Sequence, residues 1–230
     1  MFHNNLVKLK NTLKEKNIDL SIITDDDSLY YFTGYFDFLH MPFGRPTILL
    51  VPQDGDTILI TPLIDEKLIS KNCPVDKIIT WNDGVGNEWK EHLPDYMKNK
   101  LSIGIEKLKI SSLVHNYIST LFDKKIFENV TPYLDSIRMI KTQDELKIAK
   151  SAGKVAIAMM QAGKEAIGHN VPEYEVALAT SQAGTRKAAE ILQKEFEQSD
   201  MSPLIHFLQI MASGKDLPKT HHRASTKLIQ

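Results

Sequence analysis

The chain has 230 residues, of which 42% are hydrophobic, so it can form one large domain or one complete domain with part of a second. Its 28 basic and 29 acidic residues are interspersed and give a formal charge of -1, which offers no basic surface to nucleic acid or to an anionic membrane. Cys73 is the only cysteine, no secretory signal pattern is visible, and the aliphatic runs are too short to span a bilayer. We therefore expect a cytoplasmic protein with no nucleic-acid or membrane partner.

The first predicted elements are a helix and a strand. The apolar residues that recur at helical spacing are Phe2, Leu6, Leu9 and Leu13. Asn17 can end this helix in the left-handed conformation, and residues 18–24 then alternate as a strand. Residues 25–28 predict a turn and a helix cap before an aromatic-rich stretch that ends at Gly34.

Two β-rich runs, 47–51 and 57–61, are joined by a turn that contains Asp-Gly, which is typical of a hairpin. Three pairs of a helix and a strand follow, at 63–70 and 75–80, 88–97 and 101–106, and 112–122 and 126–130. Pro94 can break the second of these helices. This alternation predicts an α/β domain in which helices cover a sheet, and the hairpin makes the sheet mixed rather than wholly parallel.

A second, mainly helical part begins near residue 138. Thr142 and Glu145 form a capping-box pattern before a helix, and Pro172 suits the first turn of another. The apolar stripe of the first helix comprises Leu146, Ala149, Ala152, Ala156, Met159 and Met160. Because two long helices and one strand at 204–211 cannot close a core, we expect this domain to be unfinished in the chain or completed by another chain.

The strongest candidate for chemistry is His221, on a loop that follows an apolar strand and a small-residue turn. The adjacent His222 is not expected to share a metal ion with it, because neighbouring side chains in an extended segment point to opposite faces. Metal-assisted hydrolysis needs several carboxylate or imidazole ligands, and no such set follows His221. The sequence thus predicts the front part of an enzyme, without its metal ligands.

Arg45 is a candidate for substrate binding. It lies in a loop between Gly44 and Pro46, with the aromatic ring of Phe43 nearby, and a guanidinium held in this way is suited to bidentate contact with a carboxylate. The alternative interpretation is an ordinary solvated arginine.

Five segments resemble the creatinase, aminopeptidase P and prolidase family, whose members have a pita-bread catalytic domain. The resemblance covers nearly the whole chain, and the order and spacing of the segments make it specific. They are the Tyr-rich segment 30–35, the strand 45–52, the entry to the helical part at 138–149, the helix start at 171–173, and the Ser-Gly turn at 213–214 with His221 after it.

The resemblance implies that residues 1–137 form a mixed-sheet, ribonuclease-H-like amino-terminal domain and that 138–230 form the first part of an incomplete α+β pita-bread domain. Peptidases of the family hold two divalent ions, such as Mn, Co or Zn, on two aspartates, a histidine and two glutamates. These ligands all follow the segment that matches His221, so the chain is expected to contain none of them. The family is commonly dimeric, and Phe43 and Arg45 resemble a loop that holds substrate across the dimer.

We consider three hypotheses. The first is a metal-dependent hydrolase similar to Xaa-Pro dipeptidase or aminopeptidase P, in which His221 contacts the substrate and Arg45 and Phe43 hold it. The second is a metal-free, creatinase-like amidinohydrolase with His221 as general acid and base. The third is a truncated, non-catalytic module for dimerisation or substrate binding. A small peptide or amide is the expected substrate of the first.

Overall fold

The computed structural model describes residues 1–36, 44–69, 73–82, 84–121, 126–196, 202–205 and 210–230. The chain divides into two compact units, Met1–Lys141 and Thr142–Gln230. The predicted boundary after residue 137 lies inside a helix, α5 (Thr131–Met139), and the division of the structure follows that helix. The assignment of 1–137 and 138–230 to two family domains stays a prediction.

The first unit is built on a six-stranded sheet of order β4-β3-β2-β1-β5-β6. The strands are β1 (Leu20–Ile23), β2 (Ile48–Pro52), β3 (Ile58–Pro62), β4 (Lys77–Trp81), β5 (Ser102–Ile105) and β6 (Ile126–Asn129). The central β1 is antiparallel to β2 and parallel to β5, and β2 and β3 form the predicted hairpin with Leu49 opposite Leu59. The prediction of a mixed sheet is therefore confirmed.

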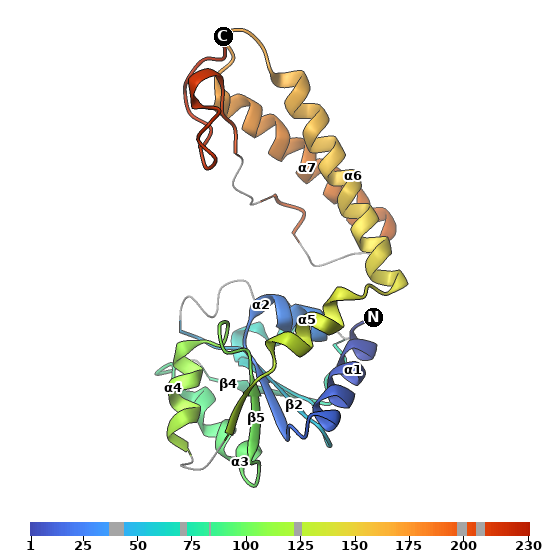
Figure 1. Cartoon of the computed structure of the whole chain (residues 1–230), viewed down its shortest axis with the longest axis vertical. Helices are drawn as coiled ribbons and strands as arrows, with labels where there is room; N and C mark the ends of the chain where they lie inside the picture. Colours follow the sequence, from blue (N-terminus) through green and yellow to red (C-terminus); the bar gives the residue numbers. More distant parts are fainter. Residues whose placement is uncertain (37–43, 70–72, 83, 122–125, 197–201, 206–209) are drawn as a thin grey trace. The chain divides into compact units, whose positions relative to one another are not determined.

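Helices cover both faces of this sheet (Figure 1). One face packs against α1 (Phe2–Glu15), α2 (Asp26–Thr33) and α5. The other packs against η2 (Glu88–His92), α3 (Leu93–Met97) and α4 (Ser112–Leu121). Because both faces are covered, β2 has apolar side chains on both of its sides: Ile48 and Leu50 enter one core, and Leu49 and Val51 enter the other.

Local signals in the sequence begin or end the first two helices where predicted. Asn17 closes α1 with a φ of 54°, and the Asp25 side chain caps α2 by accepting a hydrogen bond from the Ser28 N–H at 3.2 Å. Gly34 ends α2 with a φ of 73°. A Cβ at Gly34 would also lie 2.6 Å from the Phe2 ring, so the position requires glycine for two reasons.

Three predictions for the first unit differ from the structure. The helix expected at 63–70 is a 3₁₀ segment, η1 (Leu63–Leu68), and the helix expected at 88–97 is divided into η2 and α3. The break predicted at Pro94 is present: η2 ends at His92, and Pro94 lies in the first turn of α3, where its missing N–H leaves no helical bond unmade. Helix α5 was not predicted; its Leu134 completes the core beside α1.

The second unit contains two long helices packed against each other, α6 (Gln143–Ala166) and α7 (Glu173–Glu195). The predicted capping box of Thr142 and Glu145 is present. Gly184 permits the close packing, since a Cβ there would lie 2.7 Å from Met159 Cγ. Ile157 and Met160 of α6 are 68% and 72% exposed in the described structure.

The strand expected at 204–211 falls partly outside the described residues, since 206–209 are not described. Within the described part, Ile210 forms a single antiparallel bridge with Arg223, and no longer ladder is present there. None of the described helices combines the length and the apolar character that crossing a bilayer requires.

We predict that Gly104→Ala destabilises the first unit by about 1–3 kcal/mol, the usual cost of overpacking a core. A Cβ on Gly104, in the middle of β5, would lie 2.5 Å from Cγ1 of the buried Val130 and 3.2 Å from Cγ2 of Ile18. Urea unfolding followed by tryptophan fluorescence measures the loss, because Trp81 and Trp89 are both buried in this unit. Gly153→Ala, in α6 of the second unit, is the control: its Cβ meets no atom within 4 Å, and it should leave the tryptophan-monitored unfolding of the first unit unchanged. Equal stability of Gly104→Ala and the wild type would contradict the packing described above.

Candidate functional site

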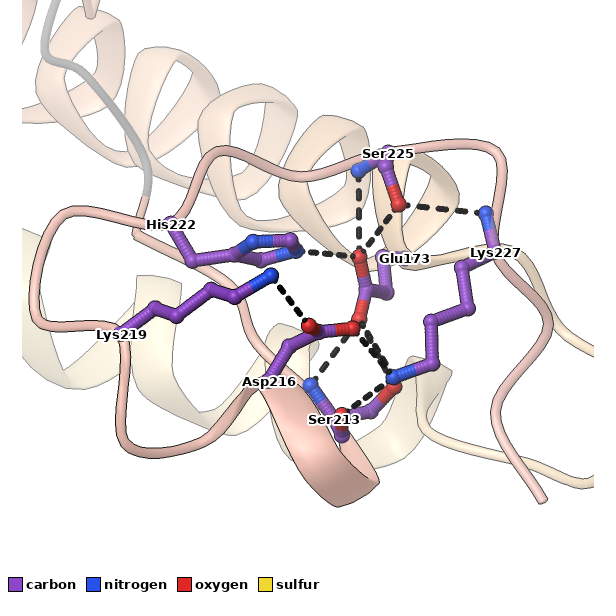
Figure 2. A network of polar contacts seen from close by, with 7 residues as sticks. All are labelled: Glu173, Ser213, Asp216, Lys219, His222, Ser225 and Lys227. Carbon is purple, nitrogen blue, oxygen red and sulfur yellow. Dashed lines mark hydrogen bonds and ion pairs between the residues drawn. The ribbon is translucent and has the colours of Figure 1, made fainter.

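A network of polar residues in the second unit surrounds Glu173, the first residue of α7 (Figure 2). Its side chain has no exposed surface. An acidic residue suits this position because the first turn of a helix has unpaired N–H groups and a partial positive charge. The Glu173 carboxylate nevertheless turns toward the segment 213–227, which supplies its hydrogen bonds.

Both oxygens of Glu173 accept hydrogen bonds from the two ends of the loop that contains His221. At Oε1, Ser213 donates from its backbone N–H at 2.9 Å and from its hydroxyl at 2.7 Å. At Oε2, Ser225 donates from its N–H at 3.2 Å and from its hydroxyl at 2.7 Å. The His222 ring completes the set, with Nε2 3.0 Å from Oε2. One buried carboxylate therefore holds both ends of the loop.

Asp216 and two lysines lie beside this carboxylate. Lys227 Nζ is 2.8 Å from Asp216 Oδ2 and 4.0 Å from Glu173 Oε1, and it also donates to the Ser213 carbonyl oxygen. Lys219 Nζ is 2.7 Å from Asp216 Oδ1. Hydrogen bonds from Lys219 and Lys227 hold the pKa of Asp216 well below its usual range. The two ammonium groups balance the two carboxylates.

The Glu173 carboxyl group is ionised in this environment. Burial raises its pKa, but the hydrogen bonds from His222, Ser213 and Ser225 together outweigh burial and lower the pKa to about 2. Because an ionised carboxylate can only accept, the Nε2 atom of His222 must carry a hydrogen. This fixes the orientation of the His222 ring.

Backbone hydrogen bonds attach the last residues of the chain to the start of α7. The pairs are Glu173 N–H to Lys227 O, Tyr174 N–H to Ser225 O, Asn170 N–H to Ile229 O, and Ile229 N–H to Val171 O. Pro172 and Leu228 form an antiparallel bridge between the same segments. N–H groups at the start of α7 thus find carbonyl partners in the segment that follows the His221 loop.

The two neighbouring histidines have different surroundings. His221 is exposed, whereas the ring of His222 contacts Glu173. Arg45 is half-buried in the first unit, between Gly44, which has a φ of 72°, and the buried Pro46. Phe43 lies outside the described residues. The roles predicted for His221, Arg45 and Phe43 stay predictions.

Sequence reasoning missed the Glu173 network. The sequence pattern places Glu173 only at a helix start and Ser213 only in a turn. The available signal was an acidic residue directly after Pro172, at a helix start, together with serines on both sides of the histidine pair. Among the described residues, no group of three or more His, Cys, Asp or Glu side chains could hold a metal ion.

Comparison with known proteins supports the resemblance seen in the sequence. The model of the creatinase/prolidase N-terminal domain matches residues 6–140. An Xaa-Pro dipeptidase from Lactobacillus helveticus is 29% identical over 185 residues, which are 75% of this chain and 47% of that protein. An agropine synthesis cyclase from Rhizobium rhizogenes is 22% identical and covers 100% of this chain and 59% of its own length. The chain spans about half the length of the curated relatives it matches.

Solved structures show the same fold in both units. A prolidase from Pyrococcus horikoshii OT3 matches with a TM-score of 0.76 and 22% identity, over 99% of this chain and 57% of that one. An Xaa-Pro dipeptidase from Bacillus anthracis matches with a TM-score of 0.77 and 19% identity, over 100% of this chain and 58% of that one. The predicted fold, a mixed-sheet amino-terminal domain followed by part of a pita-bread domain, is confirmed.

We predict that Glu173→Gln destabilises the second unit by at least about 2 kcal/mol, because the amide nitrogen cannot accept and leaves buried donors unpaired. Amide exchange at Ser213 and Ser225, with unfolding followed by circular dichroism, measures the loss. Glu175→Gln is the matched control, since Glu175 is exposed in the same first turn.

The wild type should also lose stability on acidification. The pKa of Glu173 is lowered from 4.5 to about 2 on folding. Its contribution to the free energy of unfolding is therefore complete above pH 4.5 and disappears as the pH falls from 4.5 to about 2. Over the same pH range, the free energy of unfolding of Glu173→Gln should change less with pH than that of the wild type. Equal pH dependence of the two proteins would show that the network does not stabilise the loop.

Proposed function

The chain belongs to the creatinase/prolidase N-terminal domain family, and on this premise we propose that it forms the front part of a hydrolase that cleaves a small peptide or amide bond, with Xaa-Pro dipeptides as substrates. The observation that supports this most is the Xaa-Pro dipeptidase that is 29% identical over 75% of the chain. The prolidase fold across both units agrees with it. We place the protein in the cytoplasm, as a homodimer.

His221 is the proposed catalytic residue. Its imidazole is exposed, while Glu173 holds the loop through Ser213 and Ser225 on either side of it. A ring on a loop with fixed ends loses little conformational entropy when it meets a substrate. His221 would donate a hydrogen bond to the substrate carbonyl, or to the oxyanion that develops from it, and would exchange a proton there.

Arg45 is the proposed contact for a substrate carboxylate. The guanidinium belongs to a half-buried residue between a left-handed glycine and a buried proline, which limits the motion of its backbone. In the proposed homodimer, Arg45 and Phe43 of one subunit contact substrate bound at the other subunit.

Two divalent ions, such as Mn, Co or Zn, are expected in a complete relative, where they would supply an activated water. The described residues of this chain do not fit such a pair, since they form no cluster of three possible ligands. The roles proposed for His221 and Arg45 are accordingly limited to substrate binding and proton transfer.

We predict that His221→Ala lowers kcat/KM for an Xaa-Pro dipeptide on the order of 100-fold or more, the usual contribution of a general acid or base. The assay uses the protein of the complete reading frame with added Mn, Co or Zn. His169→Ala is the matched control, because His169 is also exposed in the second unit and should leave the rate unchanged.

The same assay separates the alternatives. The cyclase among the relatives is a reason to include substrates that are not peptides, and turnover of creatine without metal would favour the amidinohydrolase. Absence of turnover with every substrate, together with dipeptide binding in calorimetry, would favour a binding module. Xaa-Pro hydrolysis that is unaffected by His221→Ala would remove His221 from the mechanism.

We predict that Arg45→Ala raises KM on the order of 10- to 100-fold for a dipeptide with a free carboxylate, since a hydrogen bond to a charged group contributes about 1.5–3 kcal/mol. A substrate capped as the carboxamide should show little difference between variant and wild type. Arg45→Lys keeps the charge without the bidentate geometry. Its KM for the dipeptide should lie between those of Arg45→Ala and the wild type. Equal kinetics with both substrates in Arg45→Ala would exclude the contact.

A further inference from the structure

A second carboxyl group, Glu106, is buried in the first unit, directly after β5. Its exposure is 2%. Oε1 lies 2.9 Å from the Ser28 hydroxyl oxygen of α2, and Oε2 is buried without a hydrogen-bond partner among the described residues. Glu106 therefore has one partner, whereas Glu173 has five donor groups.

The Ser28 hydroxyl contacts two carboxyl groups at once. Its oxygen lies 2.9 Å from Glu106 Oε1 and 3.1 Å from Asp25 Oδ2. A hydroxyl has one hydrogen, and an ionised carboxylate can only accept. With Asp25 and Glu106 both ionised, one of these contacts would bring two oxygens together with no hydrogen between them. One additional proton removes the conflict.

The surroundings show which carboxyl group holds that proton. The side chain of Asp25 is 20% exposed, and it has the Lys109 ammonium at 3.1 Å and the Ser28 N–H at 3.2 Å. Glu106 is more buried and, among the described residues, has neither an ion pair nor a backbone donor. Asp25 is therefore the charged member, and Glu106 is the neutral acid.

The charged groups around Glu106 come from three parts of the unit: Asp25 at the start of α2, Lys109 after β5, and Arg138 on α5. Burial has the largest effect and raises the pKa of Glu106; the Ser28 hydrogen bond, Lys109 and Arg138 lower it, and Asp25 raises it. The resulting pKa is about 7, in agreement with the geometry.

We infer that Glu106 is a proton-binding site of the folded first unit: below neutral pH its O–H donates to Ser28, and the Ser28 O–H donates to Asp25. The ordered chain joins the turn after β5 to α2. The Ser111 N–H, which donates to Thr24 Oγ1 at 3.0 Å, and the ion pair of Lys109 and Asp25 connect the same two segments. Loss of the proton leaves a second negative charge buried beside Asp25 and weakens this connection.

This site gives the first unit a pH dependence opposite to that of Glu173. Folding raises the pKa of Glu106 from its ordinary value of 4.5, so the folded unit binds the proton more tightly than the unfolded chain does. The contribution of Glu106 to the free energy of unfolding is complete below pH 4.5, declines as the pH rises, and is absent above about pH 7.

A carbon-13 NMR titration of the side-chain carboxyl carbons in the wild-type chain tests the inference directly. The Glu106 Cδ resonance should titrate near pH 7. A midpoint below about 5, like that of an ordinary glutamate, would overturn the inference. This measurement needs no variant, so it decides the matter even where a substitution prevents folding.

Unfolding at two pH values provides a second test. Glu106→Gln places a permanently neutral amide where the acid is protonated, and its N–H can donate to Ser28. Between about pH 5 and about pH 8, the folding equilibrium constant should fall on the order of 100-fold more in the wild type than in Glu106→Gln, as tryptophan fluorescence reports. Glu128→Gln, at an exposed position on the neighbouring β6, should behave as the wild type. Identical pH dependence of wild type and Glu106→Gln would exclude the site.

Discussion

Burying a carboxyl group costs several kcal/mol unless donors or a proton compensate for the lost water. Glu106 and Glu173 are the most deeply buried carboxyl residues described in their respective units. Glu173 has donors from two serines and a histidine, and it stays ionised. Glu106 has one shared hydroxyl, and we infer that it keeps its proton. The difference arises from position: Glu173 faces a loop whose N–H groups are available to it, whereas Glu106 opens a turn in which the N–H groups of Lys109 and Ile110 already donate to the Glu106 carbonyl oxygen.

The fold of the first unit was largely predictable because its signals are local. Asn17, Asp25 and Gly34 each act on the backbone within a few residues, and the Asp-Gly turn specifies the pairing of β2 with β3. The errors at 63–70 and 88–97 concern helix type, which depends on how short segments pack over a sheet edge. Helix α5 is specified mainly by tertiary packing, because Leu134 is buried only when β1, β2 and α1 are in place.

The candidate site was less predictable, because its contacts join residues distant in sequence. The Glu173 contacts to Ser213 and Ser225 span 40 and 52 positions. Periodicity and capping rules act over one or two helical turns and contain no information on such pairs. Composition could identify Pro172 as a helix start, but it could not show that the next side chain turns away from its own helix toward a later loop.

The adjacency of His221 and His222 connects this network to the proposed chemistry. His221 lies in a turn in which the His222 N–H donates to the Lys219 carbonyl oxygen at 3.0 Å, so it directly precedes the ring that contacts Glu173. His222 is oriented by an ionised carboxylate that also holds Ser213 and Ser225. His221 is exposed, and in the proposed function it is the histidine that meets the substrate. Under that proposal the buried carboxylate would act on the chemistry only indirectly, through its hydrogen bonds to His222 and to the serines on either side of the histidine pair.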